Sequence, residues 1–220
     1  MDRNLFSGYT GIIVVANVLV FLAYLFWAYF FQDPIYYLAL QPAMILQGKY
    51  LWTFLTSMFM HAGPAHLAFN MISLIFLGGF VERLIGKKRF IWLYFVGGII
   101  ASLFFVFFAC FFGTSAFGAK AFGSPGSLAV GASGAIFALI GLLTVLTPRM
   151  KVLVFFIIPM PMWIAMVLFT VVIWSISLSL PLHIGNTAHL GGLLVGLVYG
   201  LHLRRKYPKK TKMISRYFSN

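Results

Sequence analysis

Long apolar runs recur along this chain with almost no charged side chain inside them, and this feature limits the possible folds more than any other. Of its 220 residues, 62% are hydrophobic and 9% are charged, whereas a soluble domain carries about a quarter charged residues. A helix of about 20 apolar residues crosses the hydrocarbon core of a membrane. The chain is therefore predicted to be an all-α membrane protein, a six-transmembrane-helix bundle that forms a single membrane domain over 1–220. The predicted spans are 9–31, 63–82, 90–112, 131–148, 160–179 and 186–203.

The basic residues lie almost entirely on one side of the membrane that these spans define. All of the sixteen Lys and Arg residues except Lys49 and Lys120 fall on the side that also holds the tail 204–220. Loops rich in Lys and Arg stay cytoplasmic, so both termini are predicted to be cytoplasmic. The basic tail is then predicted to meet anionic lipid head groups, and the net charge of +13 gives no reason to expect nucleic acid as a partner.

Three connections between the spans carry further predictions. The long connection 32–60 is rich in apolar and aromatic residues and is expected to lie at the outer membrane interface as short amphipathic helices. The glycine-rich segment 113–130 is expected to be a close-packed or mobile loop that leads into Ser133. Pro159 and Pro161 interrupt an apolar run, so residues 152–158 are expected to be interfacial and the fifth span to begin near Pro159.

A serine and a histidine stand out because each heads an apolar, glycine-rich run. Ser133 lies in Gly131-Ala132-Ser133-Gly134, and His189 lies in Ala188-His189-Leu190-Gly191-Gly192. A helix rises about 1.5 Å per residue, which places Ser133 roughly 24 Å from Arg149 and His189 roughly 22 Å from Arg204, the arginines that end their spans. The two side chains therefore share one layer of the membrane, and they are predicted to be a hydroxyl nucleophile and its base.

Further polar side chains fall in the same layer. The same count places His66 and Asn70 roughly 26 and 20 Å from Arg83, and both are predicted to stabilise an oxyanion together with the backbone at Gly131 and Ser133. The only acids are Asp2, Asp33 and Glu82, and none is placed to orient His189. A Ser–His dyad is therefore expected, with the histidine oriented by packing or by a neutral partner such as an aromatic ring. Small residues that include Gly192 and Gly196 are predicted to let the helices approach closely.

These residues together resemble the rhomboid family of intramembrane serine proteases, across residues 9–205. The resemblance rests on the Ser133 and His189 motifs, on the spacing His61-(4)-His66-(3)-Asn70, and on Gly78-Gly79 followed by Glu82-Arg83. It implies that Ser133 is the nucleophile, that His189 is the base, that His66 and Asn70 hold the oxyanion and that the acid of the Glu82-Arg83 pair is structural, with no metal and no cofactor.

The resemblance also implies what such an enzyme acts on. The expected partners are the lipid bilayer and transmembrane protein substrates, single-pass proteins cleaved within or near their spans, and the fifth span is expected to gate the site with its cap loop 180–185. Many relatives carry Trp-Arg where this chain has Trp52-Thr53, a change outside the catalytic set. The expected location is a prokaryotic inner membrane, with the active site toward the outer leaflet; the physiological substrate and the oligomeric state are left open.

Two other functions compete with this interpretation. His61, His66, His183 and His189 could bind a metal or haem, but no His-Glu-x-x-His motif exists and that layer lacks carboxylate ligands. A rhomboid-like protein could instead bind client spans without cutting them, and the intact Ser133 and His189 argue against that alternative.

Overall fold

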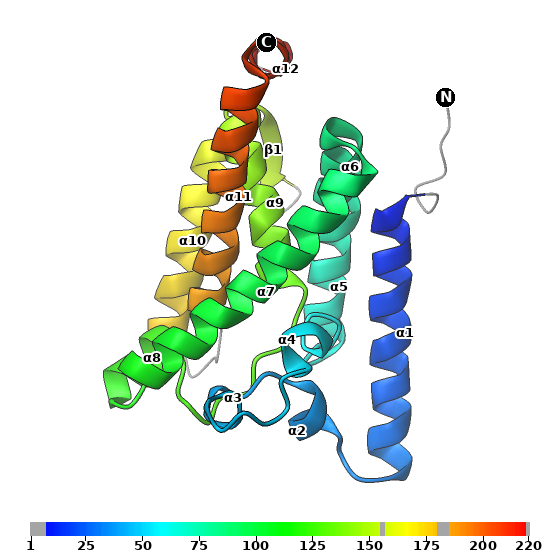
Figure 1. Ribbon diagram of the computed structural model, residues 1–220, viewed down its shortest axis with the longest axis vertical. Helices are drawn as coiled ribbons and strands as arrows, with labels where there is room; N and C mark the ends of the chain where they lie inside the picture. Colours follow the sequence, from blue (N-terminus) through cyan, green and yellow to red (C-terminus); the bar gives the residue numbers. More distant parts are fainter. Residues whose placement is uncertain (1–7, 155–156, 180–184, 219–220) are drawn as a thin grey trace.

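The computed structural model describes residues 8–154, 157–179 and 185–218, and helices dominate them (Figure 1). A helix lies in each of the six predicted ranges: α1 (Tyr9–Phe30), α5 (Pro64–Ser73), α7 (Lys87–Phe112), α9 (Ser133–Leu146), α10 (Met162–Ser179) and α11 (Asn186–Lys206). The second of these continues through a π-helical turn, η2 (Leu74–Gly78), into α6 (Gly79–Ile85). The shorter helices are α2 (Ile35–Leu38), α3 (Pro42–Leu46), α4 (Thr53–Thr56), α8 (Ala116–Phe122) and α12 (Pro208–Tyr217).

Membrane-spanning character is clearest in four of these segments. Among the described residues, Tyr9–Phe30, Pro64–Ile85, Lys87–Phe112 and Met162–Ser179 are long and apolar enough to cross a membrane. Helix α9 is apolar but has only 14 residues, and α11 has 21 residues that include several glycines and a basic last turn. The chain is thus an integral membrane protein, while the number of crossings stays a prediction for α9 and α11.

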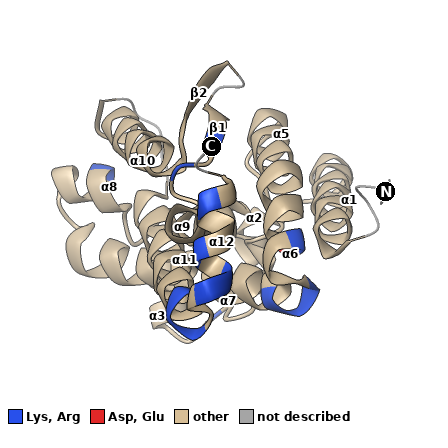
Figure 2. Cartoon of the chain, turned by 90° about the horizontal axis from the view of Figure 1, so that it is seen from above, with Lys and Arg blue, Asp and Glu red and all other residues tan. Residues whose placement is uncertain are grey.

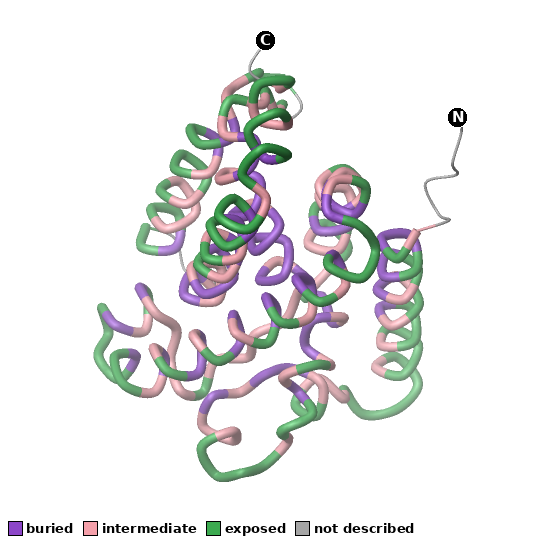
Figure 3. The backbone as a smooth tube through the Cα atoms, turned by 45° about the horizontal axis from the view of Figure 1, so that its top comes forward, coloured by how far each residue is buried: buried purple, intermediate pink, exposed green. Residues whose placement is uncertain are grey.

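Helix α9 forms the centre of the bundle, where α7 and α11 pack against it (Figures 1 and 3). Ten of its 14 residues are buried. The approach of α11 depends on glycines, since a Cβ on Gly192 would collide with the carbonyl oxygen of Gly134, and a Cβ on Gly196 with that of Ala138. Such small residues let membrane helices pack backbone to backbone, which is the structural role predicted for Gly192 and Gly196.

The non-helical stretch before α9, residues 123–132, is here called the approach segment. A helix of 14 residues is about 21 Å long, shorter than a hydrocarbon core of about 30 Å. If α9 crosses the membrane as predicted, this backbone lies at depth and needs protein partners. The connection 32–60 supplies them: Leu40 and Ala129 exchange N–H···O bonds of 3.0 and 2.8 Å, and the N–H of Ala43 donates to the Pro125 carbonyl at 2.8 Å.

The segment between the fourth and fifth helices differs from the prediction. Strands β1 (Lys151–Val154) and β2 (Ile158–Pro161) form an antiparallel hairpin, which projects between α10 and α5 in the view of Figure 2. The fold is therefore not purely α-helical, and the fifth helix begins at Met162 rather than near Pro159. Proline lacks an N–H but fits a strand whose outer edge has no partner, so Pro159 and Pro161 are accommodated in β2.

Other connections also contain more helix than the sequence suggested. The predicted loop 113–130 includes α8, and the Ser115 hydroxyl accepts the Gly118 N–H at 3.0 Å as its N-cap. In the tail 204–220, α11 continues to Lys206 and α12 follows it. The connection 32–60 contains the short helices α2, α3 and α4, as predicted; its place at a membrane interface stays a prediction.

Basic residues gather at one end of the bundle, seen end-on in Figure 2. This basic end holds the ends of α6 and α11, the start of α7 and helix α12, with Arg83, Lys88, Arg89, Arg204, Arg205 and Lys206 among its residues. The charge asymmetry predicted from the sequence is therefore present in the fold. Which side of the membrane the basic end faces stays a prediction.

Glu82 joins α6 to the start of α1. Its carboxylate oxygens accept the N–H groups of Tyr9 and Thr10, both at 2.9 Å, and the Thr10 hydroxyl at 2.7 Å. The first N–H groups of a helix have no partner within the helix, so Glu82 satisfies donors that are otherwise unpaired. The neighbouring Arg83 is exposed, and the contacts of Glu82 support its predicted structural role.

Replacing Glu82 by Gln is expected to destabilise the protein by about 1–3 kcal/mol, because an amide cannot accept from all three donors and turns an N–H₂ toward them. Thr10→Val removes one donor and should cost about 1 kcal/mol. Thermal and denaturant unfolding in one detergent measures both. Turnover per folded molecule should stay unchanged, and a variant that folds stably but has lost turnover would assign Glu82 to the chemistry instead.

Candidate active site

Ser133 and His189 lie within hydrogen-bonding distance of each other, although 56 positions separate them in sequence. Ser133 is the first residue of α9, His189 lies in the first turn of α11, and Ser133 Oγ is 2.8 Å from His189 Nε2. The two helices reach this separation because the glycines of α11 allow close packing on α9. The geometry suits proton transfer from a serine hydroxyl to an imidazole nitrogen.

An aromatic ring holds the plane of the imidazole. The ring of Phe137, one turn after Ser133 on α9, stacks on His189 with centroids 4.3 Å apart and planes inclined by 9°. Among the described residues, His189 Nδ1 has no hydrogen-bond partner. Stacking on Phe137 is thus a contact that holds the ring in addition to its bond with Ser133, and orientation of a dyad histidine by an aromatic ring stays a prediction.

Phe137→Leu is expected to lower kcat roughly 2- to 10-fold, because a stacked aromatic pair contributes about 0.5–1.5 kcal/mol beyond its burial. Phe137→Tyr keeps the stacked ring and should retain most of the activity. Steady-state cleavage by the two purified variants, normalised to folded protein, provides the comparison. Equal losses in both would show that the side chain acts through packing volume and not through ring stacking.

Gly131 keeps an open space between Ser133 and His66. Its φ of +126° is a conformation that glycine adopts readily and other residues avoid. A Cβ at this position would lie 3.0 Å from His66 Nε2 and 3.6 Å from Ser133 Oγ. The missing side chain therefore leaves room beside the serine hydroxyl for a substrate carbonyl group.

His66 presents a donor to that space. Its Nδ1 accepts the N–H of Ala62 at 3.4 Å, so in the neutral ring the proton sits on Nε2, the nitrogen nearer to Gly131. His61 is fully buried against it, with ring centroids 5.1 Å apart. Burial and the neighbouring His66 lower the pKa of His61 to about 4, so at neutral pH His61 adds no charge beside the site.

The other three predicted oxyanion groups differ in their availability. Asn70 is buried, and its amide donates one N–H to the His66 carbonyl at 2.8 Å, which leaves the second N–H free for another acceptor. The N–H of Gly131 donates to the Ser57 carbonyl at 2.8 Å and is thus already used. The Ser133 N–H lies in the first turn of α9, where no intrahelical acceptor exists.

Not every predicted residue can be placed. His183 and residues 180–184 of the predicted cap loop lie outside the described residues. Sequence reasoning missed Ser57, whose carbonyl fixes the approach segment through Gly131. No signal in the sequence marks it, because the contact uses backbone atoms that every residue type has.

Comparisons with known proteins point to one family. The Rhomboid domain model matches residues 48–206. The chain is 27% identical to "Rhomboid protease GlpG" of Haemophilus influenzae over 200 residues, which are 90% of this chain and 93% of that protein. It is 30% identical to "Rhomboid protein 1, mitochondrial" of Saccharomyces cerevisiae over 178 residues, 78% of this chain and 48% of that protein.

One relative carries a different description. "Inactive RHOMBOID-like protein 8" of Arabidopsis thaliana is 37% identical over 84 residues, 38% of this chain and 24% of that protein. This chain thus spans about half of the yeast relative and a quarter of the plant one, but nearly all of the Haemophilus protease. The domain match covers well over half of the chain and includes Ser133 and His189. On this basis, the chain belongs to the rhomboid family.

Proposed function

We propose that this protein is an intramembrane serine endopeptidase that cleaves single-pass membrane proteins within or near their transmembrane segment. The observation that carries the proposal is the 2.8 Å separation of Ser133 Oγ and His189 Nε2 inside a chain that belongs to the rhomboid family. The similarity to a protein named as a rhomboid protease over most of both chains supports it. We further propose that the site opens toward the outer leaflet of a cell membrane, with both termini cytoplasmic.

The proposed reaction uses the dyad twice. His189 Nε2 takes the hydroxyl proton as Ser133 Oγ bonds to the scissile carbonyl carbon, whose π electrons move onto oxygen. The C–N bond then breaks, the imidazolium returns its proton to the leaving amine, and an acyl-Ser133 remains. Water, deprotonated by His189, next attacks the acyl group, and Ser133 regains its proton as the carboxylic acid product leaves.

The developing oxyanion needs fixed donors. His66 Nε2–H, the second N–H of the Asn70 amide and the Ser133 N–H are the groups proposed to supply them. Gly131 is proposed to contribute space, because its own N–H is bonded to Ser57. Such donors stabilise the transition state more than the substrate, since charge collects on the oxygen only as the tetrahedral intermediate forms.

Helix α10 is proposed to gate the site. In its most apolar stretch 17% of residues are buried, against 28% for Tyr9–Phe30, 28% for Pro64–Ile85 and 39% for Lys87–Phe112. It touches the site through Phe169, whose ring stacks on Phe137 with centroids 5.7 Å apart. The Ser177 hydroxyl donates to the Lys120 carbonyl at 3.1 Å. A helix held by few contacts beside the dyad is suited to lateral movement that admits a substrate segment.

A serine-directed phosphonate probe tests the chemistry directly. The wild type in detergent is expected to bind one probe at Ser133, identified by peptide mass spectrometry, and to cleave a reporter that carries one transmembrane segment. One relative is named inactive, which makes a client-binding protein without cleavage the alternative. Wild type that folds, binds the reporter and neither reacts with the probe nor cuts would establish that alternative.

A further inference from the structure

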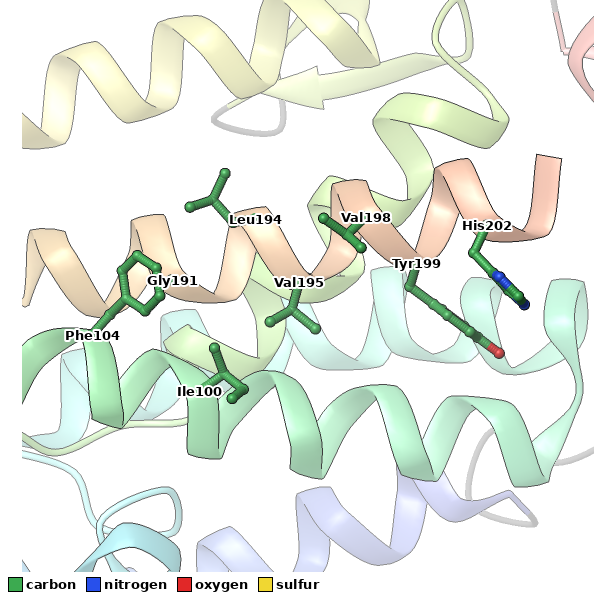
Figure 4. Close-up of a pocket in the computed structure, with 8 residues that line it drawn as sticks. All are labelled: Ile100, Phe104, Gly191, Leu194, Val195, Val198, Tyr199 and His202. Atoms are coloured by element: carbon green, nitrogen blue, oxygen red, sulfur yellow. The ribbon is translucent and has the colours of Figure 1, made fainter. Parts of the chain in front are cut away.

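An apolar groove that the proposed chemistry does not use lies on the outside of the bundle, between α7 and α11. Figure 4 shows it. It is open and holds about 600 Å³. Ile100 and Phe104 of α7 line one wall and Leu194 and Val198 of α11 the other, while Tyr199 and His202 lie toward the basic end. In an integral membrane protein such an apolar groove faces hydrocarbon.

The length of the groove fits one leaflet. Its lining on α11 runs from Gly191 to His202, which is roughly 16 Å along a helix. Half of a hydrocarbon core of about 30 Å is about 15 Å. One acyl chain of the leaflet at the basic end therefore spans the groove from end to end.

The polar end of the groove is cationic. Arg89 lies within electrostatic range of Tyr199, which lines this end of the groove. Its guanidinium donates to the Tyr207 hydroxyl at 2.9 Å and stacks 5.1 Å above the Tyr207 ring. This contact uses one of five guanidinium donors. Arg205 and Lys206 follow His202 by three and four positions, so they extend the same face of α11.

Within the described part of the chain, no carboxylate forms a salt bridge with Arg89, Arg205 or Lys206. Glu82 is bonded to Tyr9 and Thr10, and Asp33 lies just before α2, away from the basic end (Figure 1). An apolar groove of one-leaflet length that ends in uncompensated positive charge is complementary to an amphiphile with an anionic head. We propose that this groove binds one anionic phospholipid, its acyl chain along Leu194 and Val198 and its phosphate at Arg89 and His202.

Native mass spectrometry of the full chain tests the proposal. The protein, freed of lipid in a nonionic detergent, is offered equimolar phosphatidylglycerol and phosphatidylcholine with identical acyl chains. One phosphatidylglycerol should be retained in preference to phosphatidylcholine. Arg89→Gln should weaken its retention about tenfold, the value of a charge-assisted hydrogen bond, whereas Lys49→Gln, at an exposed position in the connection 32–60, should leave it unchanged.

A second pair of variants tests the apolar part. Val198 is 66% exposed in the groove, and Val198→Trp should fill it and displace the lipid; Val15→Trp, at an exposed position of α1, should not. Melting temperatures confirm folding of each variant. Equal retention of the two lipids, equal losses in Arg89→Gln and Lys49→Gln, or retention by Val198→Trp would overturn the proposal. So would a dimer of the protein that Val198→Trp dissociates, because the groove would then hold a second copy.

Discussion

Ser133→Ala is expected to lower cleavage of a reconstituted transmembrane substrate by about 10⁴-fold or more, and His189→Ala by a similar factor, because the two groups act as one unit. The double variant should be no slower than either single variant, since removal of one partner already removes the function of the other. Initial rates in liposomes, divided by the amount of folded protein, measure these losses.

Matched controls separate chemistry from packing in this experiment. Ser102→Ala removes another buried serine of the bundle, on α7, and Thr147→Ala removes a buried hydroxyl just after α9, at the opposite end of that helix from Ser133. Both should keep rates within a small factor of the wild type. Full activity in Ser133→Ala or His189→Ala would refute the assignment of the dyad.

The same histidine sets an expected pH dependence. His189 accepts the serine proton only when its imidazole is neutral, so the rate should fall as acid protonates it. A rate that stays constant through the acidic range, with chemistry limiting, would contradict the role of His189 as base.

Asn70→Ala and His66→Ala are each expected to lower kcat about 100- to 1,000-fold with little change in KM, the loss typical of one missing oxyanion donor. Asn17 provides a matched control. Its amide donates to the Ile13 carbonyl at 2.8 Å, the same one-turn bond that Asn70 makes to His66, but it lies on α1. Asn17→Ala should therefore lose about as much stability as Asn70→Ala but keep the kcat of the wild type.

Steady-state kinetics and unfolding of Asn70→Ala, His66→Ala and Asn17→Ala in one detergent distinguish a catalytic role of Asn70 and His66 from a purely structural one. If Asn70→Ala and Asn17→Ala lose stability alike and both keep normal turnover, the Asn70 amide is structural and the oxyanion is held by other groups.

The parts of the site that the sequence predicted are those set by residue type and helical rise. Ser133, His66 and His189 could be placed in one layer from their distance to flanking arginines, because a helix has a fixed rise per residue. The structure brings Ser133 and His189 together, and it adds the stacking of Phe137 that a one-dimensional count of depth cannot include.

Features that depend on long-range backbone contacts could not be predicted in this way. Strands Lys151–Val154 and Ile158–Pro161 pair through backbone atoms, with Pro159 opposite Leu153, and the expectation of an interfacial segment over 152–158 does not include this pairing. The structural role of Glu82 is predicted by the sequence, but its partners Tyr9 and Thr10 lie more than 70 positions away. Nothing in the sequence marks these two residues as hydrogen-bond donors to a distant carboxylate.

The bonds that tie the connection 32–60 to the approach segment bear on how rhomboid sequences diverge. The Leu40–Ala129 pair, the Ala43–Pro125 bond and the Ser57–Gly131 bond all join main-chain atoms, so their energy does not depend on which side chains the connection carries. Substitutions there leave the register beside Ser133 intact as long as chain length and backbone shape are kept. Thr53, where the family resemblance predicts an arginine, illustrates this freedom: it is fully buried and donates its hydroxyl to the Tyr50 carbonyl within its own turn. Insertions and deletions in this connection, rather than replacements, are therefore the changes that selection should remove.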